Sequence, residues 1–583
     1  MKTRLTPLLL LSLAACAAAP ASRPLPSAGP DVGKRAVAEH GMVASGNPYA
    51  SEAGVEILRE GGNAVDAAVA TAFALGVTEP MMSGLGAGGG LLFWNAATHR
   101  AEYVDFYSQA PSVPDSSLRA LGTSITTRGV GIPGAVSGLL GAQARWGRLT
   151  RAQVMAPAIR LAADGYVANS LLQREVLAES SKVGDYPGAR RIFLPGGRPV
   201  RAGDRIVQPE LAATMRAVAA EGPDVFYKGR IGDDIVRVLR EGGSTISRAD
   251  FAAYAARYKR PLCTTYHGRV VLSAPAPQSG MEVLEALNLL ASRDLPAMGL
   301  PSRSPEAFRA LVGAMRVAVT DRDAFVGDPD RVGVPEAGVS SPAFAATRGS
   351  LVDAPVRGRL QPGDAWADDR QPPPGACAPL EPMPPTALPR VSSLGTPGDG
   401  NLAETTHMTI VDADGNAVSL TNTLGLGFGT GTWVDGVFFN SAMFNFARND
   451  SGPNAIGPHR VPASTIAPTV VLRDGAVEMV VGCPGSAAIP PAIIATIVYG
   501  LDYGMDPLQA LRMPRMIPTV GTPLRMEDGF AMSVYAAAKQ MGFEVSTSPL
   551  NDMGFGGVTV IERRGGRWVG AADPRRDGEV RGY

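Results

Sequence analysis

Two adjacent threonines at the start of a predicted hairpin most constrain what this chain can fold into. The motif Glu-Thr-Thr-His spans residues 404–407, and residues 408–412 and 417–423 alternate apolar and polar side chains around an Asp-Gly-Asn turn. This alternation predicts a β-hairpin whose first strand begins at Thr405. If the chain is cut just before Thr405, the new α-amine becomes a base beside the threonine's own hydroxyl.

The same region resembles the γ-glutamyltranspeptidases (glutathione hydrolases), N-terminal-nucleophile hydrolases that mature by cutting themselves. The resemblance rests on the motif at 404–407, Thr-Asn-Thr at 421–423 and Phe-Gly-Thr-Gly at 428–431. It extends to Gly-Gly-Asn-Ala-Val-Asp-Ala-Ala at 61–68 and to Ala-Asp-Pro-Arg at 572–575, so that it covers nearly the whole mature chain. The plain alternative is an ordinary hairpin with threonines on its pleated face, where threonine is common.

Composition narrows the classes of partner. The 583 residues are 45% hydrophobic, which is ample for a large core. Lys+Arg and Asp+Glu are equal at 54 each. Because no net charge attracts nucleic acid or an anionic membrane surface, we expect no nucleic-acid partner and instead a small-molecule amide or peptide substrate, the substrate class that the resemblance implies.

The sequence offers no persuasive metal or cofactor motif. The five histidines are scattered and lack a metal-ligand spacing, so we expect no catalytic metal. Gly84, Gly86 and Gly89 match G-x-G-x-x-G, but they follow a predicted helix and precede a predicted strand. A dinucleotide-binding loop has the opposite order, so we predict no cofactor and assign these glycines to tight backbone packing.

The N-terminus carries an export signal. Two basic residues precede a short apolar run at 8–13, and Leu-Ala-Ala-Cys ends at Cys16. This tetrapeptide resembles a bacterial lipobox, which implies a signal peptide over 1–16, lipidation of Cys16 and a tether over 17–34. A plain secretory signal is the alternative. We therefore expect an exported, periplasmic protein that contacts a membrane only through an N-terminal lipid anchor.

Three cysteines remain after Cys16 is assigned to the anchor. They are Cys263, Cys377 and Cys483, far apart and without a C-x-x-C pair. An odd number in an oxidising compartment permits at most one disulfide and leaves a free thiol. Which two residues pair, if any, stays open at this stage.

The resemblance implies an α/β fold, the αββα sandwich of two stacked sheets between helical layers. It also implies two subunits from one precursor, a large one over 35–404 and a small one over 405–583. Residues 353–404 are rich in Pro and Gly, which predicts a mobile surface segment before the cut. A helix is predicted near 487–504.

The chemistry implied by the resemblance centres on Thr405. Its Oγ would attack the Glu404 carbonyl to form an ester that water resolves, and in turnover its amine would activate the same Oγ. Thr423 matches the family's second threonine, whose hydroxyl can contact the nucleophile. Gly485 and Ser486 lie where the family has two oxyanion-binding glycines. Ser486 therefore requires a negative φ or tolerated strain.

The predicted donor pocket departs from the family's pattern. A γ-glutamyl donor presents an α-carboxylate and an α-ammonium, which require an arginine and a carboxylate respectively. The family's arginine, asparagine, glutamine, aspartate and two serines correspond here to Tyr107, Gly425, Ala442, Asn445, Ser464 and Thr465. The segment 447–459 is also shorter than the family's lid, which predicts a more open cleft.

Three functions follow from these observations. The first is a self-processing threonine hydrolase and acyltransferase that cleaves γ-glutamyl or related amides. The second is an acylase of the same fold for aliphatic, aromatic or glutaryl-like amides, favoured by the less charged pocket. The third is a non-catalytic exported binding lipoprotein, which the intact motif at 404–407, Thr423 and the Gly485 loop disfavour.

Overall fold

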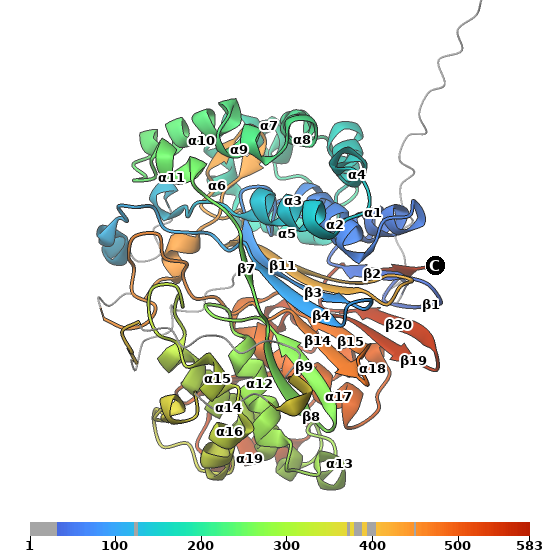
Figure 1. The fold of residues 1–583 in the computed structure, drawn as a ribbon, viewed down its shortest axis with the longest axis vertical. Coiled ribbons are helices and arrows are strands. Elements are labelled where there is room, and N and C mark those ends of the chain that lie inside the picture. The colour runs from blue at the N-terminus through green and yellow to red at the C-terminus, as the bar shows by residue number, and fades with distance from the viewer. Residues whose placement is uncertain (1–31, 122–125, 370–373, 378–387, 393–403, 448–450) are drawn as a thin grey trace, which may run out of the picture.

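Two β-sheets stack face to face, and a layer of helices covers each outer face (Figure 1). The predicted αββα sandwich is therefore confirmed. The computed structural model describes residues 32–121, 126–369, 374–377, 388–392, 404–447 and 451–583. The predicted signal peptide, Cys16 and most of the predicted tether lie outside the described residues. Lys34, at the end of that tether, is instead packed, and its Nζ donates to the carbonyl of Gly578 at 2.6 Å.

The first sheet contains the predicted hairpin at its centre, and neighbouring strands pair antiparallel. Its order is β21 (Glu579–Gly582), β2 (Met42–Ser45), β10 (Glu404–Val411), β11 (Ala417–Gly425), β3 (Gly88–Asn95), β4 (Arg100–Asp105) and β7 (Arg257–Lys259). The order of the second sheet is β1 (Arg35–Ala38), β20 (Arg567–Ala572), β19 (Thr559–Arg564), β15 (Ala476–Gly482), β14 (Thr469–Arg473), β9 (Arg269–Ser273) and β8 (Leu262–Tyr266).

The helices divide between the two outer faces in chain order (Figure 1). The first layer comprises α1 (Pro48–Arg59), α2 (Ala64–Thr78), α3 (Ala135–Trp146), α4 (Arg151–Asp164), α5 (Ser170–Ala178), α6 (Ser180–Gly184), α7 (Pro187–Phe193), α8 (Pro209–Glu221), α9 (Pro223–Tyr227), α10 (Arg230–Glu241) and α11 (Arg248–Ala252). The second comprises α12 (Gly280–Leu290), α13 (Leu295–Met298), α14 (Pro305–Phe325), α15 (Glu336–Val339), α16 (Pro342–Arg348), α17 (Ile489–Leu501), α18 (Pro507–Arg512) and α19 (Met532–Met541). The helix predicted near 487–504 is α17.

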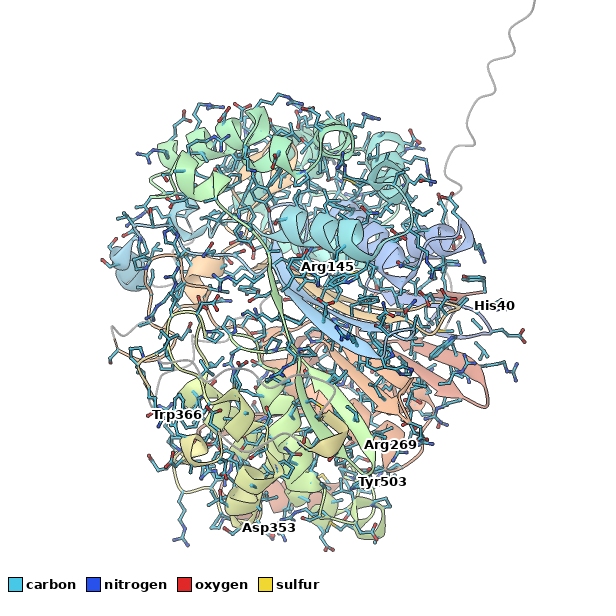
Figure 2. The ribbon with its side chains drawn as sticks, viewed as in Figure 1. His40, Arg145, Arg269, Asp353, Trp366 and Tyr503 are labelled. Atoms are coloured by element: carbon cyan, nitrogen blue, oxygen red, sulfur yellow. A yellow bond between two sulfur atoms is a disulfide. The ribbon has the colours of Figure 1, made fainter. Side chains whose placement is uncertain are left out.

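Further short strands lie outside the two main sheets in smaller groups. They are β5 (Tyr166–Val167) with β6 (Arg205–Ile206), β12 (Trp433–Val434) with β13 (Val437–Phe438), and β16 (Met516–Pro518), β17 (Pro523–Glu527) and β18 (Glu544–Ser548). Side chains fill the space between the layers (Figure 2). Within the described residues, none of the helices is long and apolar enough to cross a membrane.

Alternation along β10 decides which layer each side chain meets. Met408 and Ile410 pack with the core of the first helical layer. The neighbouring Thr409 points the other way, and its hydroxyl donates to Thr559 in the second sheet at 3.3 Å. Since side chains alternate along a strand, Thr405 shares the inner face with Thr409, whereas Thr406 faces the helices.

The turn of the predicted hairpin also joins the helical layer. Asp412 Oδ1 accepts from the backbone N–H groups of Asp414 at 3.0 Å and Asn416 at 2.9 Å. Its Oδ2 accepts from the backbone N–H of Ala64, at the start of α2, at 2.9 Å. Gly415 supplies the positive φ of 81° that the turn requires. One carboxylate thus holds the hairpin and the nearest helix together.

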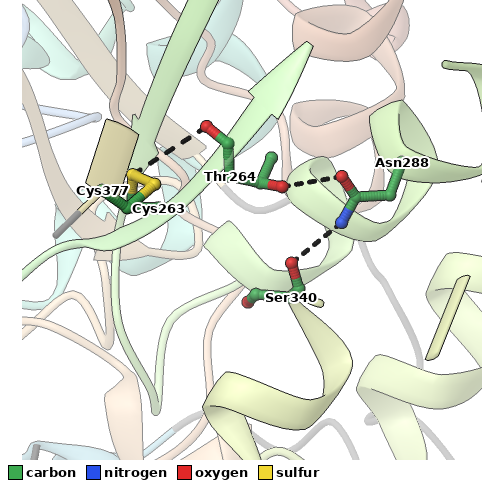
Figure 3. The surroundings of a disulfide bond; sticks show 5 residues. All are labelled: Cys263, Thr264, Asn288, Ser340 and Cys377. Carbon is green, nitrogen blue, oxygen red and sulfur yellow. Dashed lines mark hydrogen bonds between the residues drawn. A yellow bond between two sulfur atoms is a disulfide. The ribbon is translucent and has the colours of Figure 1, made fainter. Parts of the chain in front are cut away.

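The open question of cysteine pairing is answered by a disulfide between Cys263 in β8 and Cys377 (Figure 3). Cys483 is buried and free. Beside the disulfide, the Thr264 hydroxyl donates to Asn288 of α12 at 2.7 Å. The disulfide joins the second sheet to the Pro/Gly-rich segment that precedes the predicted cut.

The predicted mobile surface segment 353–404 is packed in part of its described residues. Ala365 and Cys377 are buried. The Arg390 guanidinium lies 4.9 Å from the ring centre of Trp366, which is labelled in Figure 2. The Gly333 N–H donates to the Pro389 carbonyl at 3.0 Å. Residues 370–373, 378–387 and 393–403 lie outside the described residues, so the prediction is untested there.

Candidate active site

Thr405 and Thr423 face each other across the β10–β11 pair. Their Oγ1 atoms lie 2.9 Å apart, and Thr423 Oγ1 donates to the Glu404 carbonyl oxygen at 2.9 Å. The backbone N–H of Gly425 donates to the same Thr423 hydroxyl at 2.9 Å. A hydroxyl has one proton, and Thr423 donates its proton to the Glu404 carbonyl. Thr405 is therefore the donor in the hydrogen bond between the two threonines.

The pairing register changes at the bond that is predicted to break. Glu404 pairs with Gly425 and Thr405 pairs with Thr423, so the strand is irregular between Glu404 and Thr405. Such a bulge redirects a backbone group. Gly425 has φ of +89°, and a Cβ there would lie 2.5 Å from Ser441 Oγ. The local backbone therefore favours glycine at the position where the resemblance led us to expect asparagine.

The upstream half of β10 is open on the side opposite β11, because β2 pairs with β10 only from Met408 onward. Arg576 occupies this edge, and its Nη1 donates to the Thr405 carbonyl at 3.0 Å. Its Nη2 lies 3.9 Å from Glu404 Oε2. On the helical side, the Thr406 hydroxyl donates to Glu79 at 2.8 Å.

Sequence reasoning missed Arg576 and Glu79. Arg576 directly follows the Ala-Asp-Pro-Arg motif at 572–575, which was the available signal. Glu79 directly follows α2 and caps its C-terminus. Neither position carries a local pattern that indicates its proximity to Thr405.

Burial changes the protonation of the carboxyls around this edge. Burial raises the pKa of Glu404 to about 7, although the charge of Arg576 opposes the shift. Burial likewise raises the pKa of Glu79 to about 7 against the hydrogen bond from Thr406. Both carboxyls therefore change protonation near neutral pH.

His407 follows the threonines but stays neutral. Burial lowers its pKa to about 3. Its Nδ1 lies 2.8 Å from Thr421 Oγ1, and its ring packs against Gly482, where a Cβ would lie 2.1 Å from the ring. The histidine of the motif thus fills the space between the sheets rather than carrying charge.

Gly485 and Ser486 adopt φ values of +127° and +54°. Ser486 therefore has the positive φ that we expected only if strain is tolerated, at a cost of about 1–3 kcal/mol for a non-glycine residue. Pro484, directly before this pair, lines a cavity of about 10 Å³ together with Thr406 and Arg576. That volume holds about one water molecule. The loop and the open edge of β10 thus meet at this cavity.

Two glycines of the G-x-G-x-x-G motif, Gly86 and Gly89, pack closely against neighbouring backbone. A Cβ at Gly89 would lie 2.1 Å from the Thr421 carbonyl oxygen, and one at Gly86 would lie 2.1 Å from the Phe438 carbonyl oxygen. Gly89 pairs with Asn422, next to Thr423. The predicted tight backbone packing is confirmed, and it brings β3 against the strand that carries Thr423.

Three of the predicted donor-pocket residues come together as an uncharged group. Asn445 Nδ2 donates to the Tyr107 hydroxyl at 2.8 Å, and the Ser464 side chain also hydrogen-bonds that hydroxyl. Burial raises the pKa of Tyr107, so the phenol stays neutral. The Tyr107 N–H donates to Asp105 at 3.1 Å, and Asp105 pairs with Lys259 at 2.7 Å.

The remaining predicted pocket residues have more local surroundings. Ala442 is buried, and its N–H donates to Asn440 Oδ1 at 3.0 Å. Thr465 is half-buried beside Ser464. In the described part of the segment 447–459, Asn454 Nδ2 donates to the Asn445 carbonyl at 2.8 Å. Residues 448–450 lie outside the described residues.

No group of three or more His, Cys, Asp or Glu side chains that could hold a metal ion occurs in the part of the chain that the structure describes. The site is built instead from hydroxyls, backbone amides, one arginine and two buried carboxyls. Such a set can activate a hydroxyl and bind an oxyanion, which is the chemistry of acyl transfer.

Comparison with known proteins gives the same answer. A family profile described as Gamma-glutamyltranspeptidase matches residues 50–583. The chain is 33% identical over 565 residues to the glutathione hydrolase proenzyme of Bacillus subtilis (strain 168), covering 95% of this chain and 92% of that one. It is 32% identical over 562 residues to the acylase ACY 1 proenzyme of Pseudomonas sp. (strain SE83), covering 94% of each.

Solved structures extend the likeness to the fold. The structure superposes on cephalosporin acylase from Bacillus halodurans with a TM-score of 0.82 at 25% identity, covering 97% of this chain and 99% of that one. The Helicobacter pylori gamma-glutamyltranspeptidase gives a TM-score of 0.51 at 28% identity, covering 56% of this chain and 93% of that one.

Proposed function

Because this chain belongs to the gamma-glutamyltranspeptidase family of N-terminal-nucleophile hydrolases, an enzyme family of amidohydrolases and transferases, we propose that it cuts itself between Glu404 and Thr405 and uses Thr405 as its nucleophile. The observation that carries this proposal is the Thr423 hydroxyl, which lies 2.9 Å from both the Thr405 hydroxyl and the Glu404 carbonyl oxygen. One group thus orients the nucleophile and polarises the bond that it attacks.

Maturation follows from this arrangement. Thr405 Oγ attacks the Glu404 carbonyl carbon, the peptide C–N bond breaks, and the proton from the Thr405 hydroxyl ends on the released Thr405 nitrogen. Water then hydrolyses the resulting ester and leaves a large fragment ending at Glu404 and a small fragment beginning at Thr405. Both sheets contain strands from each fragment, so pairing holds the fragments together after the cut.

Turnover repeats the chemistry with an external amide. The free Thr405 amine accepts the hydroxyl proton while Oγ attacks the donor carbonyl, and the donor's amine departs with a proton. The backbone amides of Gly485 and Ser486 are the proposed oxyanion donors. Water or a second amine then takes the acyl group and restores the Thr405 hydroxyl. No cofactor takes part in this proposal.

The identity of the acyl donor separates two candidate functions. The first is a γ-glutamyl or related amide, as in the relatives named glutathione hydrolase. The second is an amide without the α-amino group, such as a glutaryl amide, proposed by analogy with the relative named acylase. The uncharged Tyr107–Asn445 pair favours the second, because it places a neutral hydrogen bond where the family pattern calls for opposite charges. The non-catalytic alternative is set aside because the family is one of enzymes.

The test uses matured protein whose free Thr405 is confirmed by mass. It compares anilide release from γ-glutamyl and glutaryl donors, which differ only in the α-amino group. Preference for γ-glutamyl supports the first candidate, and preference for glutaryl supports the second. A precursor that never cuts, or a cut protein that releases neither anilide nor any other acyl amide, contradicts the proposal.

We also propose export with a lipid anchor at Cys16, on the signal-like sequence alone. Replacing Cys16 with Ala is expected to move the protein from the membrane fraction to the soluble exported fraction. A Cys16→Ala variant that fractionates like the wild type contradicts the anchor.

A further inference from the structure

Arg576 holds both sides of the bond that is proposed to break. It lies between β20 and β21 and is 9% exposed. Its Nη1 donates to the Thr405 carbonyl at 3.0 Å, and its Nη2 lies 3.9 Å from the Glu404 side-chain carboxyl. Among the described residues, neither Arg576 Nε nor Glu404 Oε2 has a hydrogen-bond partner. A buried guanidinium therefore faces a buried carboxyl with bonding capacity left over.

Glu404 supplies the first acyl group that this enzyme would carry. When Thr405 Oγ attacks, the ester joins Thr405 to the Glu404 acyl group, whose side chain ends in a carboxylate. The number of carbon atoms between the main-chain and side-chain carboxyl carbons of Glu404 is the same as in a glutaryl group and in a γ-glutamyl group. The precursor thus displays, on its own nucleophile, an acyl group of glutaric-acid length with its distal carboxyl beside Arg576.

Departure of Glu404 changes what Arg576 faces. Hydrolysis of the ester frees the large fragment's end, and the Glu404 side chain leaves with it. Arg576 keeps its contact with Thr405, but its Nη2 no longer faces that carboxyl. A buried guanidinium is a strong, geometrically selective partner for a carboxylate. The vacated position therefore has both the space of a glutamate side chain and a cation at its end.

Resting on the proposed function, we propose that Arg576, rather than the residue at position 107, binds the distal carboxylate of the donor in the mature site. This assignment gives the enzyme a carboxylate anchor on the open edge of β10, away from the altered position Tyr107.

Other charged side chains also surround the Glu404 carboxyl and Arg576. Glu79 competes for the guanidinium from the end of α2, but it already accepts the Thr406 hydroxyl. Arg174 and Glu175 act electrostatically on Glu404, and Asp577 acts on Glu79. Arg515 and Asp573, together with Arg576, act on Cys483. Arg515 is already paired with Asp573. Arg174 is exposed and is the natural control cation.

The experiment measures kcat/KM of the matured wild-type enzyme on p-nitroanilides of glutaric, pentanoic, succinic and adipic acid. Pentanoyl replaces the distal carboxylate with a methyl group, and the other two change only the chain length. We expect glutaryl to exceed pentanoyl by about 10- to 100-fold, the effect of one charged hydrogen-bonding contact. We also expect glutaryl to exceed both succinyl and adipyl.

Variants assign the effect to a residue. Arg576→Met is expected to bring the glutaryl-to-pentanoyl ratio close to one, while Arg576→Lys keeps part of the preference. The matched control Arg174→Met removes a nearby exposed cation and is expected to keep the wild-type ratio. Loss of the ratio in Arg174→Met with retention in Arg576→Met overturns the assignment.

A second measurement covers failure of the Arg576 variants to mature. Glutarate is expected to inhibit wild-type hydrolysis of the pentanoyl anilide at least tenfold more strongly than pentanoate. Equal inhibition, or equal kcat/KM for glutaryl and pentanoyl donors, overturns the inference while leaving the proposed function standing. Absence of a free Thr405 by mass, or of hydrolysis of every donor, overturns the proposed function and the inference with it.

Discussion

The nucleophile end of the site and the donor pocket differ in what holds them together. At the nucleophile end, Thr405, Thr423 and the Glu404 carbonyl form a chain of hydrogen bonds within one hairpin, flanked by titratable Glu79. In the donor pocket, the Tyr107–Asn445 pair is uncharged and joins segments far apart in the chain. The first region satisfies the family pattern, and the second departs from it.

This difference reflects what each region must do. Attack on a carbonyl depends on the placement of a few atoms, so a change that moves Thr423 affects every reaction that the enzyme performs. A donor pocket instead matches one substrate, and exchanging an anchor changes which substrate fits. We therefore expect a retained reaction with a revised recognition site.

The largest effect is expected for replacement of Thr405, and the adjacent Thr406 on the opposite face of β10 provides the control. Thr405→Ala is expected to abolish cutting, because the nucleophile is lost. Its matched control, Thr406→Ala, removes a hydroxyl that contacts Glu79 on the helical side and is expected to keep the cut. Intact mass distinguishes one precursor from two fragments. Cutting at the same bond in Thr405→Ala would contradict the assigned nucleophile.

A smaller but still large effect is expected at Thr423. Thr423→Val keeps the shape and removes the hydroxyl that donates to the Glu404 carbonyl. We expect self-cleavage to slow by about 10²- to 10³-fold, as for loss of one oxyanion donor. Thr423→Ser keeps the hydroxyl and is expected to cut close to the wild-type rate. The measurement follows precursor loss over time, and an unchanged rate in Thr423→Val argues against the role of the hydroxyl.

The contrast in titratable groups predicts a pH effect at the nucleophile end. Burial raises the pKa of Glu404 from 4.5 to about 7, so the folded precursor binds this proton more tightly than the unfolded chain. Its contribution to stability is therefore present below pH 4.5 and is lost as pH rises toward 7. In a Thr405→Ala precursor, we expect Glu404→Gln to reduce the stability lost between pH 5 and 8 by about 2–3 kcal/mol.

Urea unfolding of the two precursors at both pH values measures this difference. Glu79 shifts in the same direction and is present in both proteins, so the burial of Glu79 itself is common to both. An identical pH dependence with and without Glu404 would show that its carboxyl titrates normally in the folded precursor.

The smallest expected effect would make the donor pocket resemble the family pattern. Tyr107→Arg combined with Asn445→Asp replaces a neutral hydrogen bond with a charge pair suited to an α-carboxylate and an α-ammonium. We expect the ratio of γ-glutamyl to glutaryl hydrolysis to rise about tenfold. Asn445→Asp alone is the control and should give a smaller rise. An unchanged ratio in the double variant would place donor recognition outside this pair.

Local patterns were sufficient to predict the hairpin, whereas the contact between Thr405 and Thr423 was implied by the resemblance. Alternation defines the two strands, and the Asp-Gly-Asn turn sets the register that brings Thr405 opposite Thr423. The αββα arrangement followed from resemblance. By contrast, Arg576 lies 171 residues from Thr405, and Glu79 lies 327 residues from Thr406. No local sequence pattern therefore predicts either contact.

Composition was a weaker guide in the Pro/Gly-rich segment. It predicted a mobile surface segment over 353–404, because few apolar residues there can drive burial. Long-range contacts overrode this tendency in the described part, where Cys377 bonds to Cys263 and Trp366 meets Arg390. The pairing of Cys263 with Cys377 likewise depends on their approach in space, which spacing along the chain does not encode.

The sequence by itself determined the hairpin and the family and predicted the nucleophile, because strand alternation, turn chemistry and motifs are short-range properties of the chain. Tertiary structure decided which side chains meet at the open edge of β10. It placed Arg576 beside Thr405 and Glu404, raised the pKa of two carboxyls by burial, and joined Tyr107 to Asn445. These outcomes depend on packing between distant segments, and desolvation and contact exist only once those segments are brought together.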